Sequence, residues 1–124
     1  MRNSSREPLE IYIHIPFCVK KCAYCDFLSG PSGEERQQAY FKALKKEIRN
    51  VEDFSGRPVV SVFMGGGTPS VPDSRLTGEI LDEIQTKFMM APDAEITIEA
   101  NPGTLSMKKL KDYRSHGVNR LSMG

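Results

Sequence analysis

The stretch Val59-Val60-Ser61-Val62-Phe63-Met64, followed directly by Gly65-Gly66-Gly67-Thr68-Pro69, decides the fold class. A continuous apolar run of this length is typical of a parallel strand that is covered on both faces, so we predict a strand over residues 59–64. The glycines that follow have no Cβ, and their backbone N–H groups are therefore open to a ligand. The sequence predicts a buried strand with a candidate binding loop at its carboxyl end.

Three further strands, with helices between them, are expected around this run. Residues 11–15 alternate strictly, which predicts a strand with Tyr12 and His14 on one face and three isoleucines on the other. Apolar spacing and turn residues predict the remaining elements: strands over 95–100 and from 118 to 123, and helices over about 34–52, from Asp73 or Ser74 to about 88, and over about 105–115. This alternation predicts an α/β fold with a parallel sheet, in which the carboxyl ends of the strands share one edge.

Composition narrows the class of protein. The chain has 124 residues, 39% hydrophobic and 27% charged, which fits one globular domain. Seventeen Lys and Arg against 16 Asp and Glu give a net charge of +1, so charge offers no case for binding nucleic acid. No apolar run approaches the ~18–20 residues of a membrane helix, and we expect no transmembrane segment. Residues 1–9 are polar without an apolar core, which indicates a tail rather than a secretory signal.

All three cysteines, Cys18, Cys22 and Cys25, fall within eight residues. An odd number at such short spacing is a poor disulfide framework, and it indicates metal ligation in the reducing cytoplasm. Closely spaced thiolates hold iron–sulfur clusters, and three ligands would leave one iron of a four-iron cluster open. Two alternatives remain: zinc held by the three cysteines and His14, and three incidental thiols. For His14 a packed or hydrogen-bonded role beneath the site is the preferred interpretation.

The glycine loop and Glu99 are the other candidate site residues. No Gly-Lys-Ser/Thr follows the loop, and Ser70 occupies the position where a dinucleotide fingerprint needs its third glycine. An anion-binding nest and a simple tight turn are both compatible with Gly65–Thr68. Glu99 ends the strand at 95–100, where it is expected to accept a hydrogen bond from a ribose hydroxyl, with an ordinary surface carboxylate as the alternative.

Three motifs together resemble a known family. They are Ile13-His-Ile-Pro-Phe-Cys18-x3-Cys22-x-Tyr24-Cys25, then Met64-Gly-Gly-Gly-Thr-Pro69, then Ile98-Glu-Ala-Asn-Pro-Gly103. From about Glu10 to its last residue the chain resembles radical S-adenosylmethionine (SAM) proteins, and more narrowly the oxygen-independent coproporphyrinogen III oxidase family. The resemblance implies the N-terminal part of a partial (β/α)6 TIM-like barrel, with about three βα units and a fourth strand. Residues 10–124 would then be a truncated N-terminal portion of the radical SAM core domain.

The same resemblance implies the cofactors and their contacts. A [4Fe-4S] cluster would sit on Cys18, Cys22 and Cys25, and SAM would chelate its open iron. An electron passed through the cluster would cleave SAM to a 5′-deoxyadenosyl radical, while the protein supplies position and electrostatics. The SAM contacts would be Tyr12 near the cofactor, Tyr24 at the adenine, Gly65, Gly66, Gly67 and Thr68 at the methionine moiety, and Glu99 at the ribose.

One position separates two branches of this family. The decarboxylating oxidases carry a fourth cysteine where this chain has Phe27, and Asn101-Pro102-Gly103 also resembles the other branch, regarded as haem chaperones. We therefore expect a protein that binds haem and delivers it to a respiratory protein, with an electron donor as a further partner. The alternative is an enzyme that oxidatively decarboxylates coproporphyrinogen III to protoporphyrinogen IX.

Overall fold

The computed structural model describes residues 7–18, 30–52, 54 and 56–123. Strands and helices alternate along this part of the chain, as the sequence predicts. In chain order they are β1 (Leu9–Ile15), α1 (Gly30–Asn50), β2 (Val59–Gly66), α2 (Ser74–Lys87), β3 (Met90–Ala100), the short 3-10 helix η3 (Pro102–Thr104), α3 (Met107–Ser115) and β4 (Arg120–Met123). No helix among the residues that the structure describes is long and apolar enough to cross a membrane.

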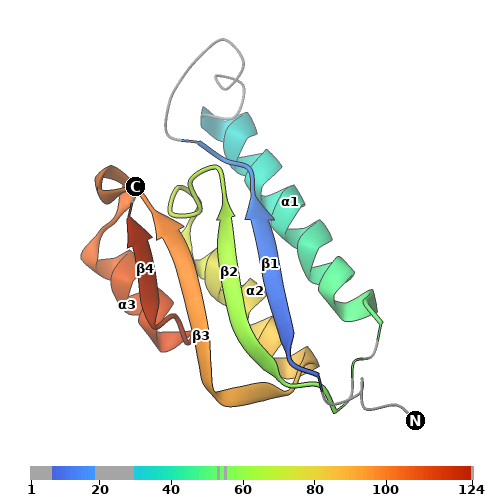
Figure 1. The fold of residues 1–124 in the computed structure, drawn as a ribbon. Coiled ribbons are helices and arrows are strands. Elements are labelled where there is room, and N and C mark those ends of the chain that lie inside the picture. Colours follow the sequence, from blue (N-terminus) through green and yellow to red (C-terminus); the bar gives the residue numbers. More distant parts are fainter. Residues whose placement is uncertain (1–6, 19–29, 53, 55, 124) are drawn as a thin grey trace.

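The four strands form one parallel sheet in the order β1-β2-β3-β4 (Figure 1). Its register aligns Tyr12, Phe63, Thr97 and Arg120 in one row across the sheet. Because the strands are parallel, their carboxyl ends lie at the same edge, as the sequence predicts.

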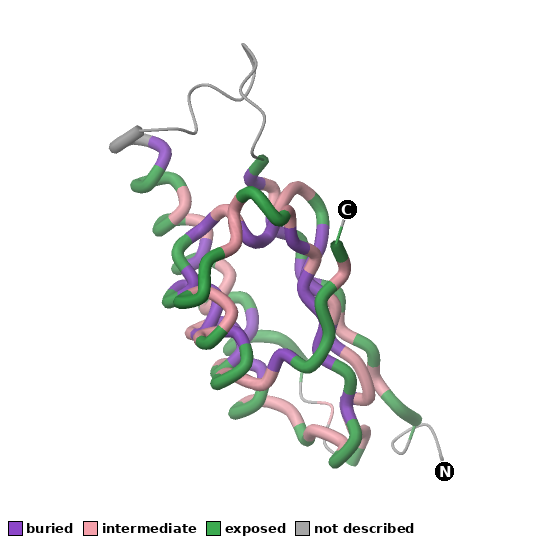
Figure 2. The backbone as a smooth tube through the Cα atoms, turned by 90° about the vertical axis from the view of Figure 1, so that its left-hand side faces the viewer, coloured by how far each residue is buried: buried purple, intermediate pink, exposed green. Residues whose placement is uncertain are grey.

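The helices lie on one face of the sheet, which leaves the other face open (Figure 2). In β1 the predicted alternation is confirmed: Ile13 and Ile15 are buried toward the helices, whereas Tyr12 is 59% exposed on the open face. From α2 and β3 the core receives mainly branched aliphatic side chains, which are Leu76, Ile80, Leu81, Ile84, Ile96 and Ile98. Burial of these side chains is the main contribution to stability, at roughly 25 cal/mol per Å² of apolar surface.

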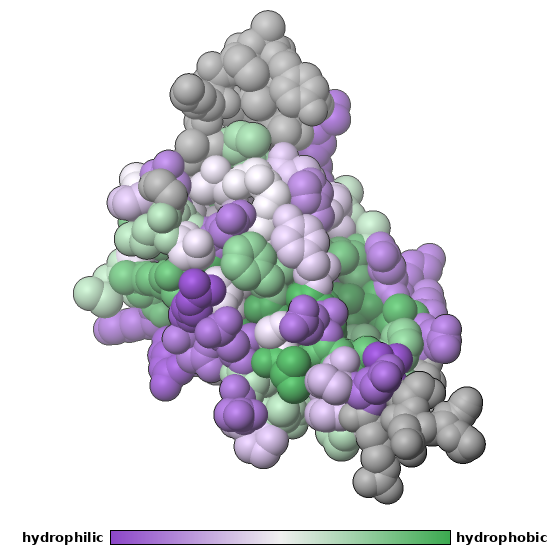
Figure 3. Space-filling view, in the orientation of Figure 1, coloured by the Kyte–Doolittle hydropathy of each residue, from purple (hydrophilic) through white to green (hydrophobic). Residues whose placement is uncertain are grey.

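The prediction that β2 is covered on both faces is wrong for the described residues. Val62 and Met64 are buried, but Phe63 is only half-buried and points to the open face. Its ring stacks on that of Tyr12, with centroids 6.1 Å apart and planes 13° apart. Figure 3 shows this face, with hydrophobic side chains near its middle and hydrophilic ones around them. The continuous apolar run therefore reflects aromatic stacking on one face and a helix-covered core on the other.

Element boundaries differ from the predicted ones in several places, including α1, α3 and β3. Helix α1 begins at Gly30, four residues before its predicted start at about residue 34. For α3, by contrast, Ser106 is the N-cap and accepts from the Lys109 amide, after the separate turn η3. Strand β3 begins at Met90 rather than at residue 95. The capping of α2 agrees with prediction, because the Asp73 side chain accepts from the Arg75 amide.

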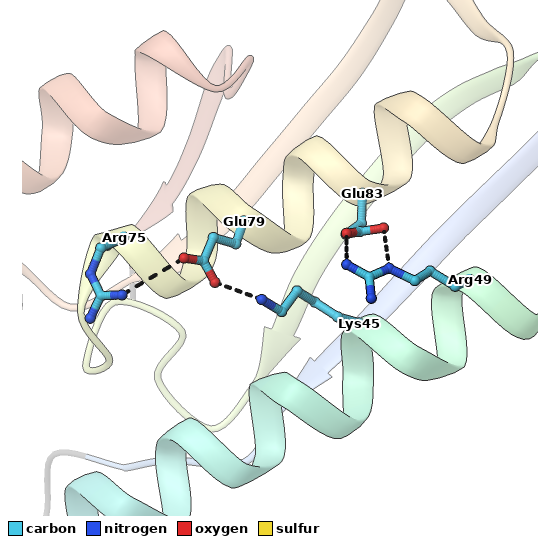
Figure 4. A network of polar contacts seen from close by, with 5 residues as sticks. All are labelled: Lys45, Arg49, Arg75, Glu79 and Glu83. Carbon is cyan, nitrogen blue, oxygen red and sulfur yellow. Dashed lines mark hydrogen bonds and ion pairs between the residues drawn. The ribbon is translucent and has the colours of Figure 1, made fainter.

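Helices α1 and α2 are joined by ion pairs along their outer sides (Figure 4). The ammonium of Lys45 lies 2.9 Å from Glu79, and Arg49 donates two hydrogen bonds to Glu83, at 3.1 and 2.5 Å. The hydrogen bonds from Arg49 hold the pKa of the Glu83 carboxyl below its ordinary value. Exposed pairs of this kind add little stability on their own.

Candidate SAM-binding edge of the sheet

The glycine loop is hydrogen-bonded to the end of β1. The amide of Gly67 donates to the Ile15 carbonyl at 2.8 Å, and that of Thr68 donates to the Phe17 carbonyl at 2.5 Å. Both bonds extend the pairing of β1 and β2 past the last ladder residues. As a result, the chain that enters the cysteine segment at Cys18 leaves the sheet directly beside the glycine loop.

Gly65 brings three of the predicted site residues together. A Cβ at this position would lie 2.7 Å from Glu99 Oε1 and 3.1 Å from the Tyr12 hydroxyl. The first distance is shorter than real Cβ contacts and the second is shorter than most of them, so the two side chains occupy space that only a glycine leaves free. Tyr12, Gly65 and Glu99 come from three different strands, and the structure places them in contact on the open face of the sheet.

Gly66 adds a directed hydrogen bond to this group. Its amide donates to Glu99 Oε1 at 3.2 Å, and its φ of 113° lies in the region that favours glycine. The ring of His14 lies against the same residue, since a Cβ there would be 2.5 Å from His14 Nδ1. The ring of His14 thus packs beside the glycine loop, although its side chain is exposed.

A hollow of about 250 Å³ opens where these strands end. Gly66, Gly67, Thr68 and Glu99 line it from the predicted set. Its other lining residues are Pro69, Ala100, Asn101 and Ser122. The hollow is therefore bordered by the backbone of the glycine loop on one side and by the Glu99 carboxylate on the other, and the carboxylate suits a ligand with hydroxyl or amine donors.

Ser122 is a lining residue that the sequence predictions missed. It is the register partner of Glu99 on β4, so it joins the hollow through strand pairing rather than through a motif. Ser122 follows Arg120 by two residues, so both side chains lie on the same face of β4. Arg120 belongs to the same row of the sheet as Tyr12. The alternation of residues 120–123 is the only signal that could have found it.

The predicted metal ligands are only partly covered by the structure. Cys18 is described and exposed, whereas Cys22, Cys25 and the predicted adenine contact Tyr24 lie outside the described residues. Among the side chains that the structure describes, no three His, Cys, Asp or Glu residues are grouped to hold a metal. The ligand assignment and the zinc alternative with His14 both stay predictions.

Comparison with known proteins identifies the family. The model of the radical SAM superfamily matches residues 12–124. The chain belongs to the radical SAM superfamily. Membership in this superfamily implies a [4Fe-4S] cluster and SAM. It also accounts for the strand order, because the parallel α/β arrangement is that of the predicted TIM-like barrel.

Individual relatives of this radical SAM chain carry haem-related names. It is 45% identical over 119 residues to the heme chaperone HemW of Escherichia coli (strain K12), covering 94% of this chain and 32% of the relative. It is 34% identical over 122 residues to HemW of Mycobacterium tuberculosis (strain H37Rv), with 95% and 31% covered. The chain thus spans about a third of the length of these curated relatives.

A solved structure is similar as well. The match is to the coproporphyrinogen III oxidase HemN of Escherichia coli, described as a radical SAM enzyme, with a TM-score of 0.82 and 33% sequence identity. It covers 97% of this chain and 28% of that one. The described sheet and its helices therefore have the arrangement of a radical SAM enzyme.

Proposed function

We propose that this chain holds a [4Fe-4S] cluster on Cys18, Cys22 and Cys25 and binds SAM at the carboxyl edge of its sheet. The observation that carries the proposal is the contact between the glycine loop, Glu99 and Tyr12, at the edge from which the cysteine segment also leaves. Membership of the radical SAM superfamily supports the same cofactor pair.

The described residues fit SAM in three respects. Gly65, which has no Cβ, lets the Glu99 carboxylate and the Tyr12 hydroxyl lie against the loop backbone. The Glu99 carboxylate can accept hydrogen bonds from ribose hydroxyls, and the glycine loop lines the same hollow. Tyr12 presents an exposed ring and hydroxyl beside them. When bound, the cluster and SAM supply radical chemistry, while these residues bind and orient the cofactor.

For the whole protein we propose haem binding and delivery to a respiratory acceptor, in the cytoplasm and with an electron donor as a further partner. The 45% identity to a protein named heme chaperone supports this function. Phe27, where the oxidases carry a fourth cysteine, supports the same branch. The second candidate is coproporphyrinogen III oxidation, which is supported by the structural similarity to HemN.

Anaerobic reconstitution with iron and sulfide tests the cluster. We expect a brown protein with about four irons per chain, and a Cys22→Ala, Cys25→Ala double variant that keeps its secondary structure but binds no cluster. A colourless protein that binds zinc but no iron would contradict the assignment. So would a double variant that retains iron and sulfide.

A matched pair of variants tests the SAM site. Glu99→Gln removes the carboxylate at the hollow, whereas Glu95→Gln changes an exposed carboxylate on the same face of β3, 3.9 Å from Arg120. Hydrogen bonds to charged groups contribute ~1.5–3 kcal/mol, so Glu99→Gln should raise the Kd for SAM roughly ten- to a hundredfold. Equilibrium dialysis should show unchanged binding for Glu95→Gln. Equal effects of both variants would refute the role of Glu99.

Turnover separates the two candidate functions. The full-length protein, with its cluster reconstituted, should bind haem stably without converting coproporphyrinogen III. Formation of protoporphyrinogen IX together with cleavage of SAM would establish the oxidase instead.

A further inference from the structure

Lys109 lies in a set of contacts that the proposed SAM site does not yet explain. From the first turns of α3, its ammonium donates to three backbone carbonyls: Ser70 at 2.5 Å, Thr104 at 3.0 Å and Val71 at 3.3 Å. These bonds use all three N–H donors of the ammonium. The described part of the chain offers no carboxylate within ion-pair distance of Lys109.

The three carbonyls belong to two different loops. Ser70 and Val71 follow the glycine loop after β2, whereas Thr104 belongs to η3, which follows Glu99 after β3. Both loops line the 250 Å³ hollow, through Thr68 and Pro69 on one side and Asn101 on the other. The Lys109 ammonium therefore connects the two loops that line the candidate cofactor site.

A ring of hydroxyl bonds joins the same two loops. Asn101 donates its amide to Ser70 Oγ at 3.0 Å, and Ser70 Oγ lies 2.5 Å from Thr104 Oγ1. The Thr104 hydroxyl donates in turn to the Asn101 carbonyl at 2.9 Å, so Ser70 is the donor to Thr104. Ser70 is fully buried, and its polar groups depend on these partners.

We propose that Lys109 is a positioning residue for SAM binding, which fixes the glycine loop against the Asn101–Thr104 turn so that the loop and Glu99 line one hollow. This inference rests on the proposed function. Neighbouring lysines on α3 do not share the arrangement: Lys108 pairs with Asp112 at 2.8 Å, and the Lys111 side chain is exposed. Burial lowers the pKa of the Lys109 ammonium, with Asp73 acting in the opposite direction, which agrees with its enclosed position.

The test compares Lys109→Met, which keeps an unbranched side chain of similar length without its charge, with Lys111→Met. Hydrogen exchange is measured on the protein before and after cluster reconstitution. We expect amides in segments 65–71 and 101–105 to exchange roughly tenfold faster or more in Lys109→Met, because three charge-assisted hydrogen bonds are lost. Amides of β1 and α1 should be unchanged, and Lys111→Met should match the unsubstituted protein. Unchanged hydrogen exchange in the two loops would refute the proposal that Lys109 fixes them to each other.

SAM binding to the reconstituted protein gives the second readout. The Kd for SAM should rise about tenfold or more in Lys109→Met, and the change that SAM causes in the paramagnetic resonance spectrum of the reduced cluster should be weakened. Val118→Ala, which removes buried methyl groups at a residue that does not line the hollow, controls for general loss of stability and should leave the Kd unchanged. If Lys109→Met fails to fold, Thr104→Val is used instead, because it removes the hydroxyl that bonds to Ser70 and to the Asn101 carbonyl. This variant should also speed hydrogen exchange in the two loops and raise the Kd for SAM.

The outcomes separate this inference from the proposed function. If the unsubstituted protein binds no SAM, the proposed function fails, and the role of Lys109 toward the cofactor fails with it. If the unsubstituted protein binds SAM and Lys109→Met binds it equally well, only the positioning role is refuted.

Discussion

Gly66 combines an unusual backbone conformation with close contacts to Glu99 and His14. The positive φ turns its amide toward Glu99, and the missing Cβ leaves room for the ring of His14. A side chain at this position would meet both a strained backbone and an occupied space.

Gly66→Ala should therefore lower the free energy of unfolding by ~1–3 kcal/mol, because alanine is disfavoured at positive φ. Gly103→Ala is the matched control: its φ is not positive, and its Cβ would only approach Asn101 Oδ1, at 3.1 Å. Urea denaturation monitored by circular dichroism measures both. Equal stabilities of the two variants would contradict the structural role of the Gly66 conformation.

Motif residues could be predicted from the sequence, whereas their supporting residues could not. Glu99 and the glycine loop stand out because an acidic residue and three glycines at strand ends are unusual for a plain turn. Ser122 and Lys109 carry no such signal. Their positions depend on strand register and on contacts 38 or 39 residues apart, which no local pattern contains.

At the scale of elements, α3 is anchored by a tyrosine with an unsatisfied hydroxyl. Tyr113 is 2% exposed, and its Oη has no hydrogen-bond partner among the described residues. Burial raises the pKa of Tyr113 to about 12, with the nearby Asp112 carboxylate adding to the effect. The helix thus gains packing from the ring and loses hydration of the hydroxyl.

Tyr113→Phe should leave stability at neutral pH unchanged or raise it by up to ~1 kcal/mol, because it removes a buried hydroxyl that has no partner. Val118→Ala, at a neighbouring buried position, should instead destabilise by ~1–3 kcal/mol through lost packing. Chemical denaturation at pH 7 distinguishes the two effects. A clear loss of stability in Tyr113→Phe would reveal a hydrogen bond to its hydroxyl.

The same tyrosine predicts a pH dependence. Its pKa rises from 10.0 in the unfolded chain to about 12 in the folded protein, so the folded state holds the proton more tightly. Stability from this group is fully present below pH 10 and is lost as the pH rises toward 12. Thermal melts across that range should show a shallower decline for Tyr113→Phe than for the unsubstituted protein. Parallel curves would refute the shifted pKa.

The order of strands and helices could be predicted from hydrophobic periodicity, but the residues at which each element begins and ends could be predicted less well. Residues 91–94 contain Pro92 and Asp93, which favour a loop, yet the structure continues β3 through them. Pairing explains the difference: Val59 partners Met90, and pairing resumes at Ser61 with Glu95, so the intervening residues form an irregularity within the ladder. Long-range pairing holds this segment extended against its local preference.

Among the residues that the structure describes, β1 and β4 are the outer strands of the sheet. On β4, Leu121 and Met123 are 38% and 54% exposed. An outer strand with exposed apolar side chains favours pairing with another chain.

Met123→Lys should therefore reduce self-association of the 124-residue polypeptide. Met107→Lys is the control, since Met107 is also highly exposed, at 67%, but starts α3 away from the sheet. Sedimentation velocity over a range of protein concentrations compares the two with the unsubstituted chain. Association that persists equally in both variants would exclude β4 as the contact.

The strand order β1-β2-β3-β4 has a consequence for how the protein is made. Each strand pairs with the one synthesised just before it, so every new βα segment that leaves the ribosome meets a template that already exists. The sheet can then form in the order of synthesis, because each strand pairs with a strand that has already been made. Limited proteolysis of ribosome-bound chains should detect protection of β1 and β2 once the chain has emerged through Ala100.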